Sequence, residues 1–285
     1  MRRFVLAAAM AGMTFGAQAA DLPILRGSLP ASPIVPNWNG WYAGGQGSYS
    51  AMEADFSRSI PGLANMIPSS AIILQPASLF SGLVPKTTTQ GGGFGGFVGR
   101  NWQWDDLVFG LEANYNYFNT LSTATTGYNS LQLVNWFGQA NPNVNSIYTV
   151  TLTGRSAVQL KDAIQFRART GWAAGNFLPY VFGAAVVGRM DVSRSVTSTV
   201  TQRDDTTVAG VVTQGPTVAL PALTQILFEQ KIDQFVAGWS GGLGLEYCVW
   251  GGLFTRVEWD YTKFLTVKST IVQANNLRFG LGYKF

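Results

Sequence analysis

Two chemically reactive residue types are almost absent from this chain of 285 residues, which has no histidine and one cysteine, Cys248. The histidine base of the common hydrolases is therefore missing, so the sequence predicts no catalytic residue and no enzyme. One cysteine without histidine provides neither an internal disulfide nor a metal site. Cys248 is expected to be inert near a turn, with intermolecular pairing as the alternative.

A nucleotide cofactor is not predicted either. The segment GGGFGG, residues 91–96, matches a glycine-rich nucleotide loop by count. Such a loop must lie between a strand and a helix, and this segment does not. Close packing of backbone within a strand explains these glycines, so we expect no cofactor.

Charge and long apolar runs are also scarce. Charged residues make up 12% of the chain, against about 25% in soluble domains. The formal net charge is +4, and the sequence has no basic cluster, so no nucleic-acid partner is predicted. Downstream of the N-terminus, the most apolar stretch, residues 71–85, is interrupted by Gln75, Pro76 and Ser78. Helices that span a membrane are therefore excluded after processing.

The N-terminal segment has the three parts of a secretory signal peptide. Arg2 and Arg3 precede a short apolar run, and Ala17-Gln18-Ala19 forms a small-x-small cleavage site. We expect residues 1–19 to be removed by cleavage between Ala19 and Ala20, because the apolar run is too short for a membrane anchor. Residues 20–39 contain four prolines and are expected to form an extended leader before a domain at 40–285.

A two-residue alternation of apolar and polar side chains recurs along the rest of the chain. In VFGLEANY, for example, Phe109, Leu111 and Ala113 alternate with Glu112 and Asn114. Alternation of this period is typical of β-strands, which send successive side chains to opposite faces. Eight such segments are predicted as strands: residues 40–50, 91–104, 107–117, 164–172, 177–190, 235–247, 253–261 and 275–285.

The apolar faces could cover the core of a soluble sandwich or contact lipid. A sandwich explains neither the export signal nor the low charge, whereas a barrel in a bilayer explains both. Aromatic residues near strand ends would form the interface girdles: Trp41, Trp102, Trp172 and Trp259. Backbone groups in lipid must all be paired, so the barrel must be closed.

The connections between the predicted strands alternate between short and long. Short turns are expected around Asp105 and Asp106, around residues 174–176 and around residues 249–252. Long connections are expected at about 53–90, 120–162 and 191–233, which is the pattern of transmembrane barrels with long outer loops. The last two are rich in Thr and Val, so strands extending beyond the membrane, or a barrel of ten strands, remain alternatives to eight strands.

Six motifs in order resemble the small outer-membrane β-barrel surface antigens, which are also known as outer-membrane immunogenic or porin-family proteins and are related to the OmpA barrel. The motifs are ADLP, WNGWYAGGQGSY, VFGLEANY, FRARTGWA, LPYVFGAA and RFGLGYKF, and the resemblance covers residues 38–285. It implies eight antiparallel strands in the cell outer membrane of a Gram-negative envelope. It also implies that Tyr283 and Phe285 form the signal read by the barrel assembly machinery. Arg100 departs from the pattern, which usually has an apolar residue there, and is expected to reach the interface.

The inward faces carry most of the charge. We expect a paired network inside the barrel, made of Glu112, Arg167, Arg169, Glu246, Arg256, Glu258, Asp260, Arg278 and Lys284. An eight-stranded barrel is just wide enough for side chains to fill, and buried charges are costly unless paired. The alternative is a charged pore lining that selects ions.

Two functions follow from these alternatives. The first is a structural and surface-interaction protein, whose barrel anchors outer loops that contact lipopolysaccharide, outer-membrane lipid, or a ligand on host or neighbouring cells. The second is a narrow channel for small solutes or ions. The apolar segment 59–86 could cover the barrel rim or contact a partner.

Overall fold

The computed structural model describes residues 37–60, 83–119, 121–138 and 140–285, which all fall in one compact unit, Val35–Phe285. Residues 20–36 of the predicted leader and the cleavage site at Ala19 and Ala20 lie outside the described residues. The described residues form ten strands: β1 (Gly40–Asp55), β2 (Thr87–Trp104), β3 (Leu107–Phe118), β4 (Ser122–Val134), β5 (Val144–Trp172), β6 (Phe177–Val208), β7 (Val211–Ala219), β8 (Gln225–Trp250), β9 (Leu253–Phe264) and β10 (Ile271–Lys284). A 3₁₀ turn, η3 (Pro221–Leu223), lies between β7 and β8.

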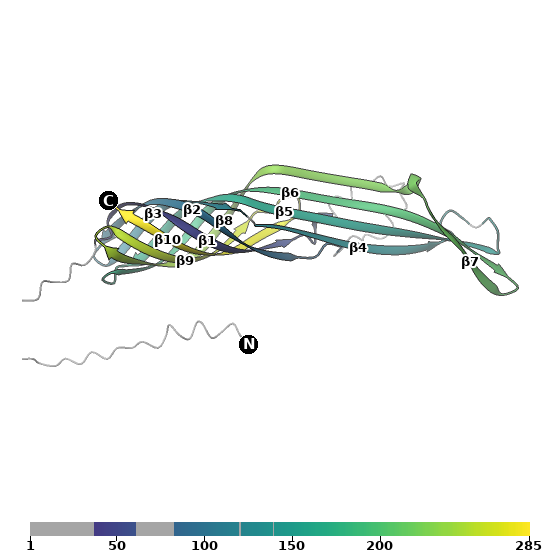
Figure 1. Cartoon of the computed structure of the whole chain (residues 1–285), viewed down its shortest axis with the longest axis horizontal. Helices are drawn as coiled ribbons and strands as arrows, with labels where there is room; N and C mark the ends of the chain where they lie inside the picture. Colours follow the sequence, from purple (N-terminus) through teal and green to yellow (C-terminus); the bar gives the residue numbers. More distant parts are fainter. Residues whose placement is uncertain (1–36, 61–82, 120, 139) are drawn as a thin grey trace, which may run out of the picture. The chain divides into compact units, whose positions relative to one another are not determined.

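Eight of these strands close into a ring of antiparallel pairs, in the order β1–β2–β3–β5–β6–β8–β9–β10 and back to β1. The prediction of a closed eight-stranded barrel is therefore confirmed, and the ten-stranded alternative is wrong. β4 and β7 pair only with parts of β5 and β6 that continue past the ring. Figure 1 shows these strands running on beyond the ring.

Within the ring, the apolar face of each strand points outward, as predicted for contact with lipid. Trp41 is 55% exposed, whereas its neighbour Tyr42 is 1% exposed. The same contrast separates Leu111, 58% exposed, from Glu112, which is 4% exposed. No helix among the described residues is long and apolar enough to cross a membrane.

Three short turns lie at one end of the ring, which we call the turn end; the opposite end is the mouth end. The turns follow β2, β5 and β8, at the predicted positions. Asp105, Gly175 and Gly251 have φ angles of 50°, 60° and 57° in these turns. Such angles tighten a connection, and glycine adopts them without steric cost. The start of β1 and the end of β10 lie at this end too, since the Phe285 amide donates to the Trp41 carbonyl.

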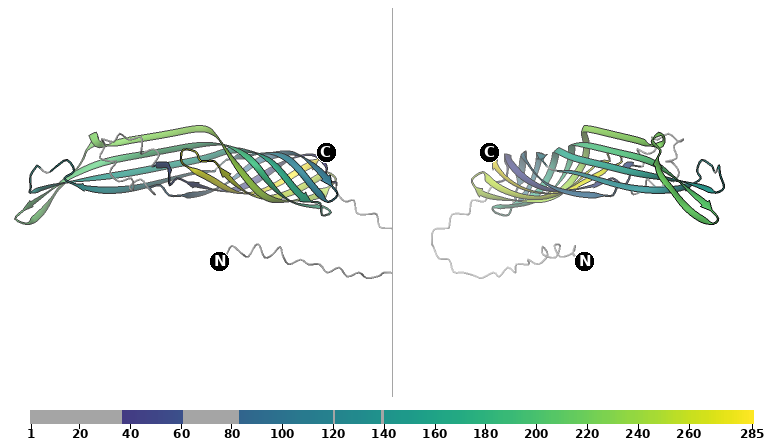
Figure 2. Two further views of the ribbon diagram at one scale, coloured as in Figure 1. Left: turned by 180° about the vertical axis from the view of Figure 1, so that it is seen from behind. Right: turned by 45° about the vertical axis from the view of Figure 1, so that its right-hand side comes forward.

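Two of the three predicted long connections, 120–162 and 191–233, are mostly strand. β5 has 29 residues and β6 has 32, whereas about 9–11 residues cross a bilayer. Beyond the mouth end, β4, β7 and the continuing parts of β5, β6 and β8 form what we call the extended sheet (Figures 1 and 2). Paired strands replace the loops expected at 120–162 and 191–233, which agrees with the alternative that the Thr- and Val-rich strands continue beyond the ring.

The extended sheet has two unlike faces. One face is apolar and buried, with Val150, Leu152 and Val196. The other carries cross-strand hydroxyl pairs such as Thr151 opposite Thr199. Ile60, Leu83 and Val84, the described ends of the β1–β2 connection, are buried in the cluster that covers the apolar face. The middle of that connection, residues 61–82, lies outside the described residues.

Candidate functional site

Eight of the nine predicted interior charges lie together inside the ring, and each is at most 5% exposed. We call this group the interior ion network. It contains four guanidinium groups and four carboxylates: Arg167, Arg169, Arg256, Arg278, Glu112, Glu246, Glu258 and Asp260. The network is therefore electrically balanced, which lowers the cost of burying each charge.

Strand register explains part of this arrangement. Glu112 on β3 lies opposite Arg167 on β5, and Glu246 on β8 lies opposite Arg256 on β9. Arg278 on β10 lies opposite Glu258 on β9. Opposite charges on directly paired positions attract each other across neighbouring strands. Each of these three paired positions therefore joins an acid to a base.

Other contacts cross the lumen and join β9 to β3, β5 and β6. Glu112 accepts hydrogen bonds from Arg256 Nη1 at 2.7 Å and from Arg167 Nη1 at 3.2 Å. Arg167 Nη1 also donates to Glu258 Oε2 at 2.9 Å, so one guanidinium joins two carboxylates on different strands. The Tyr180 hydroxyl donates to Glu258 Oε1 at 2.5 Å. These bonds tie β3, β5, β6 and β9 together through the centre of the ring.

The remaining pairs extend the network toward both ends. Arg169 Nη1 and Nη2 donate to Glu246 Oε1 and Oε2 at 2.5 and 3.1 Å, a bidentate pair. Arg278 pairs with Asp260 nearer the mouth end. Lys284 does not join them, because its ammonium donates instead to the Asn37 carbonyl at the turn end. No described carboxylate pairs with Lys284, since it is the last residue of β10 and extends from the rim.

The sequence places four amide side chains on the polar faces of the strands, but the predicted network left them out. Gln46 Nε2 donates to the side-chain oxygens of Asn114 and Asn116, both at 2.9 Å, and Gln46 Oε1 accepts from Arg256 at 3.0 Å. Gln165 Oε1 accepts from Arg167 Nη2 at 2.6 Å. These residues share the inward parity of the charges, and that parity could have identified them.

Aromatic rings close the network on its turn-end side. The guanidinium of Arg169 lies 4.7 Å from the ring centre of Tyr42 and 4.6 Å from that of Tyr180. Gly99 makes room for Tyr42, because a Cβ at Gly99 would come within 2.3 Å of the tyrosine hydroxyl. We call the surrounding apolar group the turn-end plug: Trp38, Tyr42, Phe97, Val108, Ala173, Leu178, Tyr180, Phe182 and Phe254. Trp38, assigned from sequence to the leader, is 3% exposed within it.

A second apolar group fills the mouth end, and we call it the mouth cluster. It begins with Met52, Phe118 and Phe264 at the strand ends and continues along the buried face of the extended sheet. All three are at most 3% exposed. Among the described residues, side chains therefore occupy the interior at three levels: the turn-end plug, the interior ion network and the mouth cluster.

Four segments meet at the mouth in what we call the mouth clasp. Arg194 on β6 donates to Glu229 on β8 through Nε at 2.8 Å and to the Ser59 carbonyl at 2.7 Å. Lys268, in the turn between β9 and β10, lies 2.5 Å from Glu229. Hydrogen bonds from Lys268 and then Arg194 hold the pKa of Glu229 below its ordinary value. The clasp fastens the extended sheet to the ring.

The predicted surface residues lie outside the ring. Trp41, Trp102 and Trp172 are near the turn end, whereas Trp259 lies midway along β9 and is 45% exposed. Tyr283 and Phe285 are 52% and 75% exposed, with their ring centres 5.7 Å apart. Their role as an assembly signal stays a prediction. Cys248 is partly exposed at the turn end, where its thiol donates to the Gly251 carbonyl.

Comparison with solved structures gives matches of low sequence identity. Neisserial surface protein A is 13% identical over 86% of this chain and 97% of its own, with a TM-score of 0.33. Ail, the attachment invasion locus protein of Yersinia pestis, is 8% identical over 87% of this chain and 99% of its own, with a TM-score of 0.27. The N-terminal β-barrel domain of Pseudomonas aeruginosa OprF is 11% identical over 84% and 97%, with a TM-score of 0.25.

No curated protein sequence matches this chain significantly. The family model for the outer membrane protein beta-barrel domain, however, matches residues 5–285, nearly the whole chain. This match agrees with the closed ring, its apolar outer surface and its buried charges. The chain belongs to the outer membrane protein β-barrel family and is a protein of the bacterial outer membrane.

Proposed function

We propose that this barrel is a closed, non-enzymatic anchor that presents the extended sheet at the cell surface. The observation that carries the proposal is the filling of the ring at three levels. Arg167, for example, is 3% exposed and bonded to two carboxylates, so it does not line an open aqueous path. An eight-stranded barrel has little space beyond its own side chains. This packing supports an anchor over the alternative of a narrow channel.

The outward face of the extended sheet supports a role in contact. Thr149, Thr151 and Thr153 on β5 lie opposite Thr201, Thr199 and Thr197 on β6. Tyr128 on β4 is 78% exposed. A row of hydroxyl groups beside an exposed aromatic ring suits polar, carbohydrate-rich surfaces such as lipopolysaccharide or the coat of another cell. Binding residues of many proteins lie on such segments held by a rigid scaffold.

A labelling experiment tests surface presentation. Tyr128→Cys places a thiol on the extended sheet, and the native Cys248 at the turn end is the internal control. A membrane-impermeant maleimide applied to intact cells should label the Tyr128→Cys protein and leave the wild type unlabelled. After the outer membrane is permeabilised, Cys248 should react as well. Labelling of the wild type in intact cells, or none of Tyr128→Cys, would overturn the proposed orientation.

A further inference from the structure

The lipid-facing surface carries an unusual cation at the turn end. Arg100 on β2 is exposed and has outward parity, and its guanidinium lies 5.6 Å from the ring centre of Trp41 and 5.2 Å from that of Trp102. Among the described residues, no carboxylate forms an ion pair with Arg100. The two tryptophans fix its depth, since tryptophan is enriched at the headgroup level of membranes. A single positive charge is thus held at an interface without a protein counter-charge.

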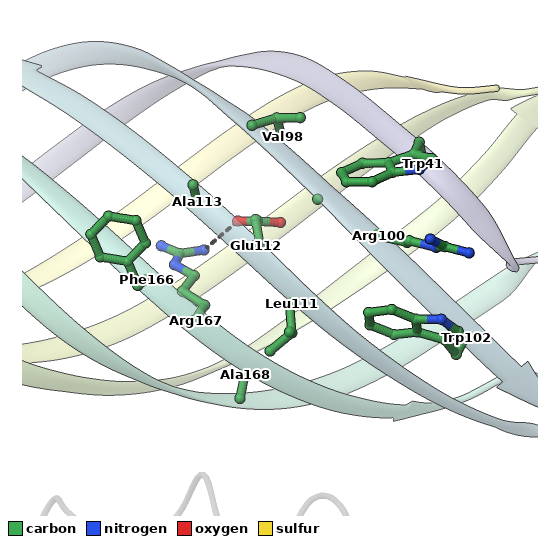
Figure 3. A pocket seen from close by; sticks show the side chains of 11 residues that line it. Trp41, Val98, Arg100, Trp102, Leu111, Glu112, Ala113, Phe166, Arg167 and Ala168 are labelled. Carbon is green, nitrogen blue, oxygen red and sulfur yellow. Dashed lines mark hydrogen bonds and ion pairs between the residues drawn. The ribbon is translucent and has the colours of Figure 1, made fainter.

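A groove runs from this cation along the outer surface. Its floor is formed by the small side chains Ala113 and Ala168, and its walls by larger ones such as Phe166. Figure 3 shows Trp41, Arg100 and Trp102 grouped at one end and Phe166 at the other. The hollow has a volume of about 570 Å³.

Strand pairing explains the hollow. One row across four strands reads Trp41, Arg100, Leu111 and Ala168. The next row toward the mouth end reads Ala43, Val98, Ala113 and Phe166. Small residues therefore follow large ones along the strands, with Ala113 beside Leu111 on β3 and Ala168 beside Phe166 on β5. A second hollow of about 410 Å³ shares Val98 and Ala113 and has Gly96 in its lining, so the depression continues toward the middle of the barrel surface.

We infer that this groove binds one glycerophospholipid of the periplasmic leaflet, with its phosphate on Arg100 and an acyl chain along Ala113 and Ala168. Guanidinium groups pair strongly with phosphate, and the unpaired charge supplies the complementarity. The apolar lining suits a hydrocarbon chain. The turn end carries the short connections, which in such barrels face the periplasm. Phospholipid phosphates of the inner leaflet lie at this level, whereas lipopolysaccharide lies at the opposite end.

Native mass spectrometry of the folded full-length mature chain, released from detergent containing dioleoylphosphatidylglycerol, tests the site. The wild type should retain one lipid, and Arg100→Gln should bind it roughly tenfold more weakly, the effect of losing one charged hydrogen bond. Ala168→Phe, which fills the floor and keeps the charge, should also weaken retention. Lys263→Gln is the matched control, because Lys263 is an exposed cation of the same outward parity at the mouth end, with no ion-pair partner among the described residues.

Each outcome decides the proposal. Equal retention by Arg100→Gln and wild type would overturn it, as would an equal loss in Lys263→Gln, which would indicate unspecific lipid. Retention unchanged by Ala168→Phe would overturn the acyl-chain groove. Heat-modifiable migration in gels checks that each variant folds. If Arg100→Gln does not fold, Arg100→Lys is measured in its place; it keeps the charge and should retain most of the lipid.

Discussion

Replacement of Glu112 by glutamine tests whether charge balance stabilises the barrel. The side chains of Glu112, Arg167 and Arg256 are at most 1% exposed, so solvent screens their interactions little. The variant leaves four guanidinium groups facing three carboxylates, with one buried positive charge uncompensated. Removing one member of a buried ion pair costs roughly 3–5 kcal/mol. We expect the free energy of unfolding to fall by about 3 kcal/mol, the lower end, because a glutamine oxygen still accepts from Arg256.

The measurement is urea unfolding of the barrel from lipid vesicles, followed by tryptophan fluorescence. Asp106→Asn, in an exposed turn, is the control and should change the free energy of unfolding by less than about 0.5 kcal/mol. The double variant Glu112→Gln/Arg167→Gln restores charge balance and should be more stable than the sum of the two single changes predicts. A Glu112→Gln barrel as stable as the control would refute the argument from charge balance.

Two further predictions concern the extended sheet. Because Lys268 and Arg194 lower the pKa of Glu229, the clasp's stabilisation should be complete above the ordinary glutamate pKa of about 4.3 and lost as pH falls through the lowered value. Protection of the β8 amides beyond the ring against hydrogen exchange, corrected for intrinsic exchange, should therefore drop in acid in the wild type. The Glu229→Gln variant should lack this protection already at pH 7. Equal protection of the two proteins at pH 7 would contradict the clasp. A second variant lacks residues 122–159 and 192–231, and a two-residue turn closes each gap between paired positions. It should still form a heat-modifiable barrel. Failure of the ring to fold would show that the ring requires the extended sheet.

Period-two alternation was sufficient to predict the eight ring strands, whereas the face that meets lipid also required the export signal and the low charge content. Glu112 and Arg167 could be placed inside because each alternates with apolar neighbours. Their partners across the lumen could not be predicted, since the contact of Arg167 with Glu258 depends on ring closure and strand tilt as well as on register. Lys284 has the parity of the network, yet its position at the strand end takes it to the rim.

The remaining differences have similar causes. Thr and Val alternate in residues 144–160, but the same composition suits an irregular loop, so only pairing between β5 and β6 distinguishes the two. Trp38 precedes the first strand and has no alternating neighbours, and its burial arises from contact with Phe254, 216 residues later. The mouth clasp brings together Arg194 on β6, Glu229 on β8 and Lys268 after β9, which lie in three separate segments of the chain. Such contacts between distant segments leave no local pattern in the sequence.

Single-channel recording of the chain refolded without residues 1–19 in planar lipid bilayers tests the central claim of a closed barrel most directly. The three filled levels predict no steady conductance from a preparation shown to be folded by its heat-modifiable migration. Stable, reproducible openings whose size changes when Arg167 or Glu112 is neutralised would establish a pore through the interior ion network and contradict the account.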